Sequence, residues 1–433
     1  PDAGKGTFWC GYHEDYNIYS STNPVPTSGV VHTYTQNHVI YCINWARKNL
    51  PVDTTQVNLV GVSSGGYGVL LTSYLIPEKI ASVYAIVEPD QIASNGFTGN
   101  EMWGTRESNL KSDVLNPETG DTIRIFDFMN ANYMLQVNKN QSLPYLCSVH
   151  GKNDYTTGWK EIPNFYDTLQ LMFAGGVYYW DQREHDGQGS NFLDSETMPS
   201  FDWLRSDLSY PAFSNCSINA DPGNGNREDG SPHGAINGYL KWVKKSITDE
   251  PCDYDVKVYL KDLYVGGVLD AKQYSTCFTD ISFRRLQYFK PQPGQSIKWS
   301  CFDSSNKKIQ GGSFIYNGGL ITLKGIQVDK TANRIELKIS DCEKELGSAH
   351  QPPVNEKMIP FIRTSGGWQS MIYSEQAGEL TLNVYNILGE MVVQKSIQLT
   401  TGENMIFIPC TTSGIYIVQM KSHSMLQVQK LEY

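Results

Sequence analysis

Residues 57–68, with the sequence VNLVGVSSGGYG, are the part of the chain best suited to carry chemistry. An apolar, β-rich run ends at the GVSSG sequence of residues 61–65, and a segment that favours a helix follows at once. A strand, a sharp turn and a helix around G-x-S-x-G form the context in which a serine is held in a strained conformation as a nucleophile. Glycines stand two residues to either side of Ser63, where small neighbours are needed. We therefore expect Ser63 to be a nucleophile, the alternative being a small residue in a glycine-rich turn.

A serine nucleophile needs a base to take its proton and a carboxylate to orient that base, in the chain order Ser, Asp/Glu, His. The sequence LCSVHGKND at residues 146–154 predicts a buried strand with Asp154 just past its end. The next predicted strand, residues 177–180, is followed by a loop that contains His185. Such loops meet at the carboxyl edge of an open α/β sheet. Ser63, Asp154 and His185 are therefore predicted to form a catalytic triad.

Other residues could take the roles assigned to Asp154 and His185. Asp154 could instead cap a following helix, with Asp90 after the preceding strand as the acid. His185 competes with His150 and His233. His150 precedes the end of its strand, which favours a hydrogen bond in the core, and His233 lies in a polar linker.

The remaining site residues follow from the elbow and from aromatic content. The backbone N–H of Ser64 is predicted to donate to an oxyanion, because a helix N-terminus favours negative charge. A second donor would belong to a loop that this sequence does not contain. Trp159, Trp103, Trp180 and Tyr12 are candidates to line an aromatic substrate cleft, although such side chains are also common in cores.

Composition limits the classes of partner and cofactor. The 433 residues carry a formal net charge of −10 without any basic run, which argues against nucleic acid and anionic membranes as partners. No apolar stretch approaches the length that spans a bilayer. The nine cysteines show no metal-ligand spacing, which argues against structural zinc. The chemistry of a serine triad needs neither a metal nor an organic cofactor, so we predict none. Disulfides would be compatible with export.

Residues 1–213 alternate strand-like and helix-like segments, which predicts a mostly parallel α/β domain. The expected strands are 57–62, 83–87, 145–149 and 177–180, and the expected helices are 33–50, 66–75 and 163–173. Residues 91–143 form a long excursion that is either a lid over the site or a decorated surface loop.

The rest of the chain reads as all-β. Residues 214–234 form a polar linker whose acidic and amide groups could bind calcium, although their spacing does not match an EF-hand. Residues 235–346 show short alternating runs that predict an antiparallel β-sandwich, and a second linker follows at 347–357. The same pattern over 358–433 predicts a small all-β C-terminal domain.

Residues 30–210 resemble the α/β-hydrolase superfamily, especially secreted esterases of the polyhydroxybutyrate-depolymerase and feruloyl-esterase type. The resemblance rests on Asp53, GVSSGGYG at 61–68, VHGKND at 149–154 and His185. Serine peptidases of the prolyl-oligopeptidase group carry similar GxSxGGY and HGxxD motifs and are a rival. Because that superfamily places several strands before the helix at 33–50, we expect this chain to be the C-terminal portion of a longer protein.

Residues 360–433 resemble the C-terminal sorting domain of the type IX secretion system of Bacteroidetes. The matching residues are LNVYNILGE at 382–390, GEN at 402–404, SGIYIV at 413–418 and KL at 430–431, although the usual Asn-Pro is absent from 359–369. This resemblance implies contact with the type IX secretion machinery and a secreted or cell-surface location.

These features predict a secreted serine hydrolase that cleaves small-molecule or polymeric carboxylic esters through an acyl-enzyme. One alternative is a serine peptidase with the same triad. The other is a non-catalytic surface protein whose sandwich binds a glycan.

Overall fold

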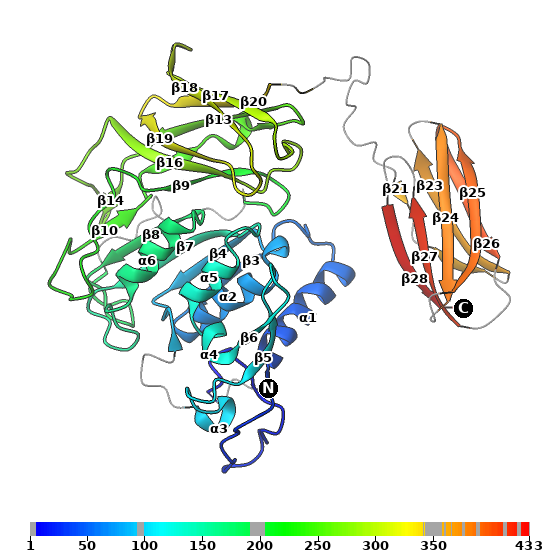
Figure 1. Ribbon diagram of the computed structural model, residues 1–433, viewed down its shortest axis with the longest axis horizontal. Coiled ribbons are helices and arrows are strands. Elements are labelled where there is room, and N and C mark those ends of the chain that lie inside the picture. The colour runs from blue at the N-terminus through cyan, green and yellow to red at the C-terminus, as the bar shows by residue number, and fades with distance from the viewer. Residues whose placement is uncertain are drawn as a thin grey trace. The chain divides into compact units, whose positions relative to one another are not determined.

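The computed structural model of the chain describes residues 6–92, 99–190, 204–340, 342, 357–358, 361–364, 366–374, 377–386, 390–409, 414–421 and 426–432. Its contacts form two compact units, residues 1–342 and residues 343–433. In the first unit an α/β layer with a five-stranded sheet adjoins a β-sandwich (Figure 1).

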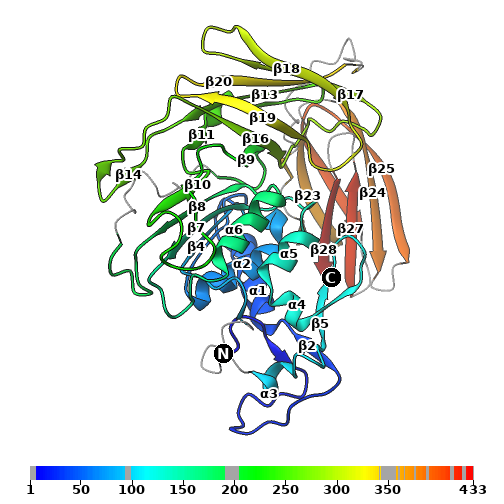
Figure 2. The ribbon, with the colours of Figure 1, turned by 60° about the vertical axis from the view of Figure 1, so that its left-hand side comes forward.

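The main sheet has the strand order β10-β8-β7-β4-β3 (Figure 1). Figure 2 shows β10, β8, β7 and β4 in the same order. Its members are β3 (Asn58–Val62), β4 (Ser82–Ile86), β7 (Tyr145–Gly151), β8 (Gly176–Asp181) and β10 (Gly234–Ile236). The first four are parallel and begin and end within two residues of their predicted bounds, whereas β10 is antiparallel to β8. Strands β7 and β8 are buried along their whole length, as apolar central strands of a parallel sheet are. Strand β3 lies at the edge, with Val60 and Val62 more than half exposed.

The predicted helices are also present. They are α1 (Tyr34–Asn49), α2 (Ser64–Leu75) and α6 (Ile162–Leu171). Helix α2 packs on β3 and β4, so the residue at its start is fixed between two strands of the sheet. Among the described residues, none of the helices has the length and apolar character needed to cross a membrane.

The excursion at 91–143 folds as part of a second, smaller sheet. It contributes α3 (Asn100–Trp103), β5 (Lys111–Leu115), β6 (Thr122–Arg124), α4 (Ile125–Phe128) and α5 (Ala131–Val137). Strand β5 runs parallel to β2 (Val30–His32), which pairs with β1 (Tyr12–His13). Residues 93–98 of the excursion lie outside the described residues.

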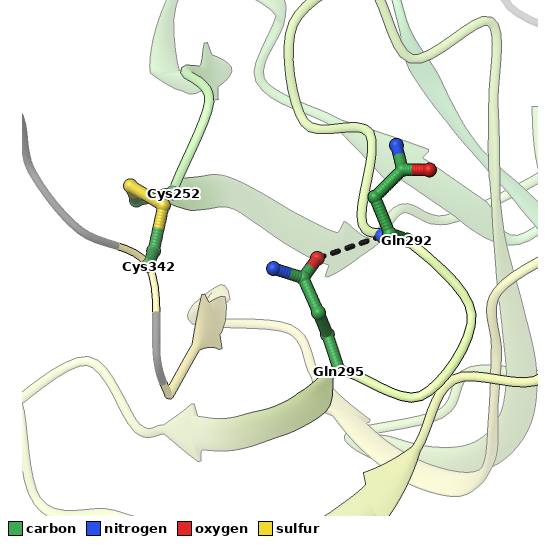
Figure 3. The surroundings of a disulfide bond; sticks show 4 residues. All are labelled: Cys252, Gln292, Gln295 and Cys342. Atoms are coloured by element: carbon green, nitrogen blue, oxygen red, sulfur yellow. Dashed lines mark hydrogen bonds between the residues drawn. A yellow bond between two sulfur atoms is a disulfide. The ribbon is translucent and has the colours of Figure 1, made fainter.

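The predicted antiparallel strands of the sandwich are present in two sheets. One sheet contains β9 (Tyr210–Ser214), β16 (Thr276–Arg284) and β19 (Thr322–Asp329). The other contains β11 (Leu240–Trp242), β12 (Thr248–Asp249), β13 (Asp253–Leu260), β17 (Ser296–Phe302), β18 (Lys308–Ile315) and β20 (Asn333–Ile339), and a short hairpin adds β14 (Tyr264–Val265) and β15 (Val268–Leu269). A disulfide between Cys252 and Cys342 joins the residue before β13 to the end of the sandwich (Figure 3).

The chain crosses between the two layers of the first unit more than once. The predicted domain boundaries at 213 and 234 did not anticipate these crossings. Strand β9 pairs with β16 in the sandwich, and the chain then returns as β10 to pair with β8. It leaves again as β11, beside β13. The side chains of Arg284 and Arg285, both buried, donate to backbone carbonyls of the α/β layer, including those of Phe173 and Pro77. A return strand of three residues inside a polar segment has no periodicity by which a sequence could reveal it.

The described residues of the second unit form β-strands, as expected. One sheet contains β21 (Lys357–Met358), β22 (Ile362–Thr364), β23 (Gly367–Ser374) and β26 (Gly402–Pro409), and the other contains β24 (Gly378–Asn386), β25 (Met391–Leu399), β27 (Ile415–Lys421) and β28 (Leu426–Glu432). Alternate residues such as Leu380, Leu382 and Val384 point into its core. Residues 347–356 of the predicted linker at 347–357, and residues 387–389, lie outside the described residues.

Candidate active site

Ser63 stands on a strained turn between β3 and α2. Its backbone has φ 56° and ψ −125°, a region that non-glycine residues rarely occupy. The turn is held because the Ser63 N–H donates to the Ile86 carbonyl of β4 at 2.8 Å, and the Tyr67 N–H donates to the Ser63 carbonyl at 3.1 Å. Hydrogen bonds to β4 and α2 therefore hold Ser63 in this strained conformation.

Small residues are required at two of the glycines around Ser63. A Cβ atom on Gly61 would lie 2.2 Å from the Gly65 carbonyl oxygen, and one on Gly66 would lie 2.8 Å from the Glu88 Cβ. A Cβ atom on Gly65 would have no neighbour within 4 Å. The expectation that both glycines of the motif must be small is thus corrected: the close approaches are at Gly61 and Gly66.

The side chains of Ser63, His185 and Asp154 form one hydrogen-bonded chain. His185 Nε2 lies 2.8 Å from Ser63 Oγ, and His185 Nδ1 lies 2.7 Å from Asp154 Oδ2. The three residues come from the loops after β3, β7 and β8 at the carboxyl edge of the main sheet. The His185 side chain is 28% exposed, whereas that of Asp154 is 1% exposed. The imidazole can thus be reached from solvent while the carboxylate cannot.

Asp154 is held as a carboxylate by a set of donors. Burial alone would raise its pKa, but the hydrogen bonds from His185, Thr157 and Thr156 outweigh burial and lower it. Asp154 Oδ1 accepts from the backbone N–H groups of Thr156 and Thr157 at 2.8 and 3.0 Å. An ionised Asp154 requires the proton of a neutral His185 on Nδ1, which leaves Nε2 free to accept the Ser63 proton.

The competing acid and bases lie elsewhere. Asp90 accepts from the side chain of Asn132 at 3.2 Å, and burial raises its pKa to about 6. His233 immediately precedes β10. His150 is buried and bonds within the core, as predicted.

A second polar group, here called the buried polar cluster, consists of Glu88, Ser148, His150 and Tyr166. Ser148 Oγ donates to Glu88 Oε1 at 2.7 Å, and His150 Nε2 lies 3.0 Å from the Glu88 carbonyl oxygen. Burial raises the pKa of Glu88 to about 8 and lowers that of His150 to about 4. Sequence reasoning missed Glu88, although an acidic residue directly after a buried strand was the available signal.

The backbone N–H of Ser64, which the sequence predicts as an oxyanion donor, lies at the start of α2. Ser64 is the first residue of this helix, so its N–H has no acceptor within the helix. The adjacent Ser63 carries the hydroxyl that hydrogen-bonds to His185.

The aromatic residues expected at a substrate cleft are mostly core residues. Trp159 and Trp103 are each 2% exposed, and Trp180 is fully buried. The Trp159 ring packs 6.0 Å from that of Trp180, and Trp103 Nε1 donates to the Gly11 carbonyl. Tyr12 is half-buried, with its ring 4.6 Å from that of Tyr34. This assignment is corrected for the three tryptophans, because burial, which composition cannot report, decides it.

The polar linker surrounds a lysine. The Lys152 ammonium donates to the Asp229 carbonyl at 2.5 Å and is attracted by Asp229, Asp221 and Glu228. The positive charge of Lys152 therefore lies near the acidic linker residues that were considered above as calcium ligands. Among the described residues, no three His, Cys, Asp or Glu side chains gather in a way that could hold a metal ion.

Residues 369–432 match the family of secretion system C-terminal sorting domains. This domain indicates export by type IX secretion to the cell surface or the extracellular space, which confirms the predicted location. It also implies that the chain interacts with the secretion machinery. No curated protein matches the sequence.

Several solved structures are weakly similar to parts of the chain. A fluorophosphonate-binding serine hydrolase of Staphylococcus aureus, FphF, is 16% identical over 38% of this chain and 62% of its own, with a TM-score of 0.28. S-formylglutathione hydrolase (FrmB) of the same organism is 14% identical over 36% of this chain and 57% of its own, with a TM-score of 0.25. A segment of two fibronectin type III domains of chicken tenascin is 11% identical over 38% and 95%, with a TM-score of 0.15. The chain thus aligns with less than two thirds of either hydrolase.

Proposed function

We propose that this protein is an exported serine hydrolase that cleaves carboxylic esters. The observation that carries the proposal is the continuous hydrogen-bonded chain from Ser63 Oγ through His185 to Asp154, at 2.8 and 2.7 Å. A hydroxyl, an imidazole and a buried carboxylate in this order are the groups that acyl transfer through a serine requires. The strained backbone of Ser63 supports the same role, because strain of this kind persists where it serves function.

In the proposed reaction, Ser63 Oγ attacks the acyl carbon while His185 Nε2 accepts the hydroxyl proton. The oxyanion that forms lies at the start of α2, where the N–H of Ser64 donates to it. The Asp154 carboxylate holds the imidazole in position and stabilises the imidazolium. His185 then protonates the leaving alcohol, and water hydrolyses the acyl-enzyme by the reverse sequence of proton transfers.

Esters are proposed in preference to peptides because Asp53, ahead of β3, belongs to the resemblance to secreted esterases, whereas the motifs at 61–68 and 149–154 are shared with the serine peptidases. The structure also offers an accessible imidazole and an unpaired helix N-terminus, which suit either substrate. Turnover of p-nitrophenyl acetate and butyrate should therefore exceed that of aminoacyl p-nitroanilides. A preference for the anilides would instead assign the protein as a serine peptidase with the same triad.

Covalent labelling tests the nucleophile itself. The wild-type protein should react with a fluorophosphonate probe, and Ser63→Ala should abolish the label. Ser148→Ala is the matched control, because Ser148 also lies near a histidine and a carboxyl group but is fully buried. This control should label like wild type. Labelling that survives Ser63→Ala would overturn the assignment, and an unlabelled, ester-inactive wild type would favour a binding protein.

A further inference from the structure

Two cysteines meet where the strands β9 and β16 leave their regular pairing. Cys216 lies two residues after β9, and Cys277 lies within β16. The backbone contact of the two segments continues past Ser214, because the Ser217 N–H donates to the Phe278 carbonyl at 2.8 Å. The Phe278 N–H in turn donates to Ser217 Oγ at 3.0 Å. Each cysteine is thus the chain neighbour of a residue in this contact, and because the pairing is antiparallel the two cysteines lie diagonally across the segments.

Both side chains enter the same apolar core of the sandwich, with 6% and 2% of their surface exposed. The structure holds both as thiols, and the side chains of Cys216 and Cys277 interact with each other. That contact lowers the pKa of the Cys216 thiol and raises the pKa of the Cys277 thiol, which burial raises further. Cys301, a buried cysteine of the same sandwich, instead faces the Gln327 carbonyl at 3.8 Å.

The surroundings of an exported protein favour joining such a pair. The sorting domain at 369–432 indicates export from the cytoplasm, and disulfides persist in the oxidising compartments beyond it. The same sandwich already contains the Cys252–Cys342 bond (Figure 3). A second pair in sulfur contact would meet the same oxidising conditions during folding.

We propose that Cys216 and Cys277 form a second disulfide in the exported protein. The Cys216 thiolate attacks a sulfur of a protein or small-molecule disulfide and displaces one thiol of that oxidant. The Cys277 thiolate then attacks the Cys216 sulfur of the mixed disulfide and releases the second thiol. The two S–H bonds of the cysteines are lost, one S–S bond forms, and the oxidant is reduced to two thiols. Since both sulfurs are buried in the folded protein, the exchange precedes closure of the sandwich.

The bond would fix the start of the segment that runs from β9 to β10, because Cys216 lies two residues after β9. The Asp229 and Ser231 carbonyls of this segment accept hydrogen bonds from the Lys152 ammonium, just after β7, and from the Trp180 indole N–H of β8. The Arg227 guanidinium also lies over the Tyr155 ring, 4.1 Å from its centre. The disulfide would therefore fix one end of a segment whose middle contacts Tyr155, the residue that follows Asp154. This inference does not depend on the proposed hydrolase activity.

Peptide mapping tests the bond on the full chain. The protein is refolded in a mixture of reduced and oxidised glutathione, denatured in iodoacetamide without reductant, and digested with trypsin. Cys216 and Cys277 fall in separate peptides, residues 206–227 and 273–284, each with one cysteine. We expect these two peptides as a linked pair that disappears on reduction. The pair 246–257 and 339–344, joined by Cys252 and Cys342, reports that the conditions were oxidising.

Variants separate the bond from general folding. Cys216→Ser should leave Cys277 fully alkylated and should speed tryptic cleavage after Arg227 severalfold in the native protein. Cys277→Ser should leave Cys216 fully alkylated and should speed the same cleavage. Cys301→Ser should leave the linked pair and the cleavage rate unchanged. If Cys216 and Cys277 are both alkylated while the Cys252–Cys342 pair is linked, the proposal is wrong. Linkage of either cysteine to a different partner would also overturn it.

Discussion

Two sets of serine, histidine and carboxyl side chains occur along the main sheet, and their surroundings differ. In the first set, Ser63, His185 and Asp154 come from three loops at the carboxyl edge. In the buried polar cluster, Ser148 and His150 belong to one strand, β7, and Glu88 follows the neighbouring strand β4. The same residue types are therefore presented once across loops and once along strands.

The order of the hydrogen bonds separates the two sets. His185 lies between the serine and the carboxylate, so it can receive a proton from one while oriented by the other. In the buried polar cluster, Ser148 donates directly to the Glu88 carboxyl, and burial keeps both Glu88 and His150 uncharged near neutral pH. Composition alone cannot make a triad, since connectivity and access to solvent decide what the groups can do.

The largest contrast is expected between the two serines. Ser63→Ala should lower ester turnover by about 10⁴- to 10⁶-fold, because the nucleophile is lost. Ser148→Ala should retain wild-type turnover and lose about 1 kcal/mol of unfolding free energy, the size of one buried hydrogen bond. Steady-state kinetics and urea unfolding measure the two effects. Equal losses of turnover in both variants would break the comparison.

The two carboxyl groups should differ in the same sense. Asp154→Asn should lower kcat by about 10⁴-fold, because an amide no longer holds His185 in the required tautomer. Glu88→Gln should leave kcat within a few-fold of wild type, since Glu88 contacts Ser148 and His150 but neither Ser63 nor His185. Circular dichroism on both variants checks that the fold is retained. A large loss of kcat in Glu88→Gln alone would transfer the orienting role to the buried polar cluster.

The pH dependence of stability sharpens the contrast. Burial raises the pKa of Glu88 from 4.5 to about 8, so the folded protein binds a proton there that the unfolded chain releases. The stability linked to this group is therefore fully present below about pH 4.5 and is lost as the pH rises towards 8. At about 1.4 kcal/mol per unit of pKa, the loss is on the order of 5 kcal/mol.

Urea unfolding at several pH values tests this linkage. Glu88→Gln removes the titrating group, so its stability relative to wild type should improve steadily from pH 5 to pH 8. Parallel curves for the two proteins would show that Glu88 is ionised in the folded state. His150 acts in the opposite sense, because its lowered pKa costs stability as the pH falls from about 6.5 to 4.

The smallest effect is expected at Gly66, which lies in the turn after Ser63 and next to Glu88. Gly66→Ala should lose about 1–3 kcal/mol, because its Cβ would lie 2.8 Å from the Glu88 Cβ and overpack the site. Gly65→Ala is the matched control in the same helix turn, where a Cβ meets open space and alanine favours the helix by about 0.5–1 kcal/mol. Thermal unfolding should rank Gly65→Ala above Gly66→Ala, and the reverse order would contradict the contact.

Features with a local sequence signal could be predicted. The four parallel strands and three main helices follow from apolar runs bounded by turns, and the order Ser63, Asp154, His185 follows from strand ends. Features set by tertiary burial could not be predicted in this way. Trp159 and Trp103 look the same in a cleft or a core, and Glu88 is a charged residue that only the fold buries. Likewise, no local pattern distinguishes Gly66 from Gly65.

The return of the chain as β10 governs how this molecule can be divided. A fragment that stops at residue 213 would leave the outer edge of β8 unpaired and would carry away most of β9, which the sandwich needs opposite β16. Neither layer can therefore be excised with one cut, as a module joined end to end could be. A truncation that preserves both layers therefore has to keep β9, β10 and β11 together with the two sheets they join.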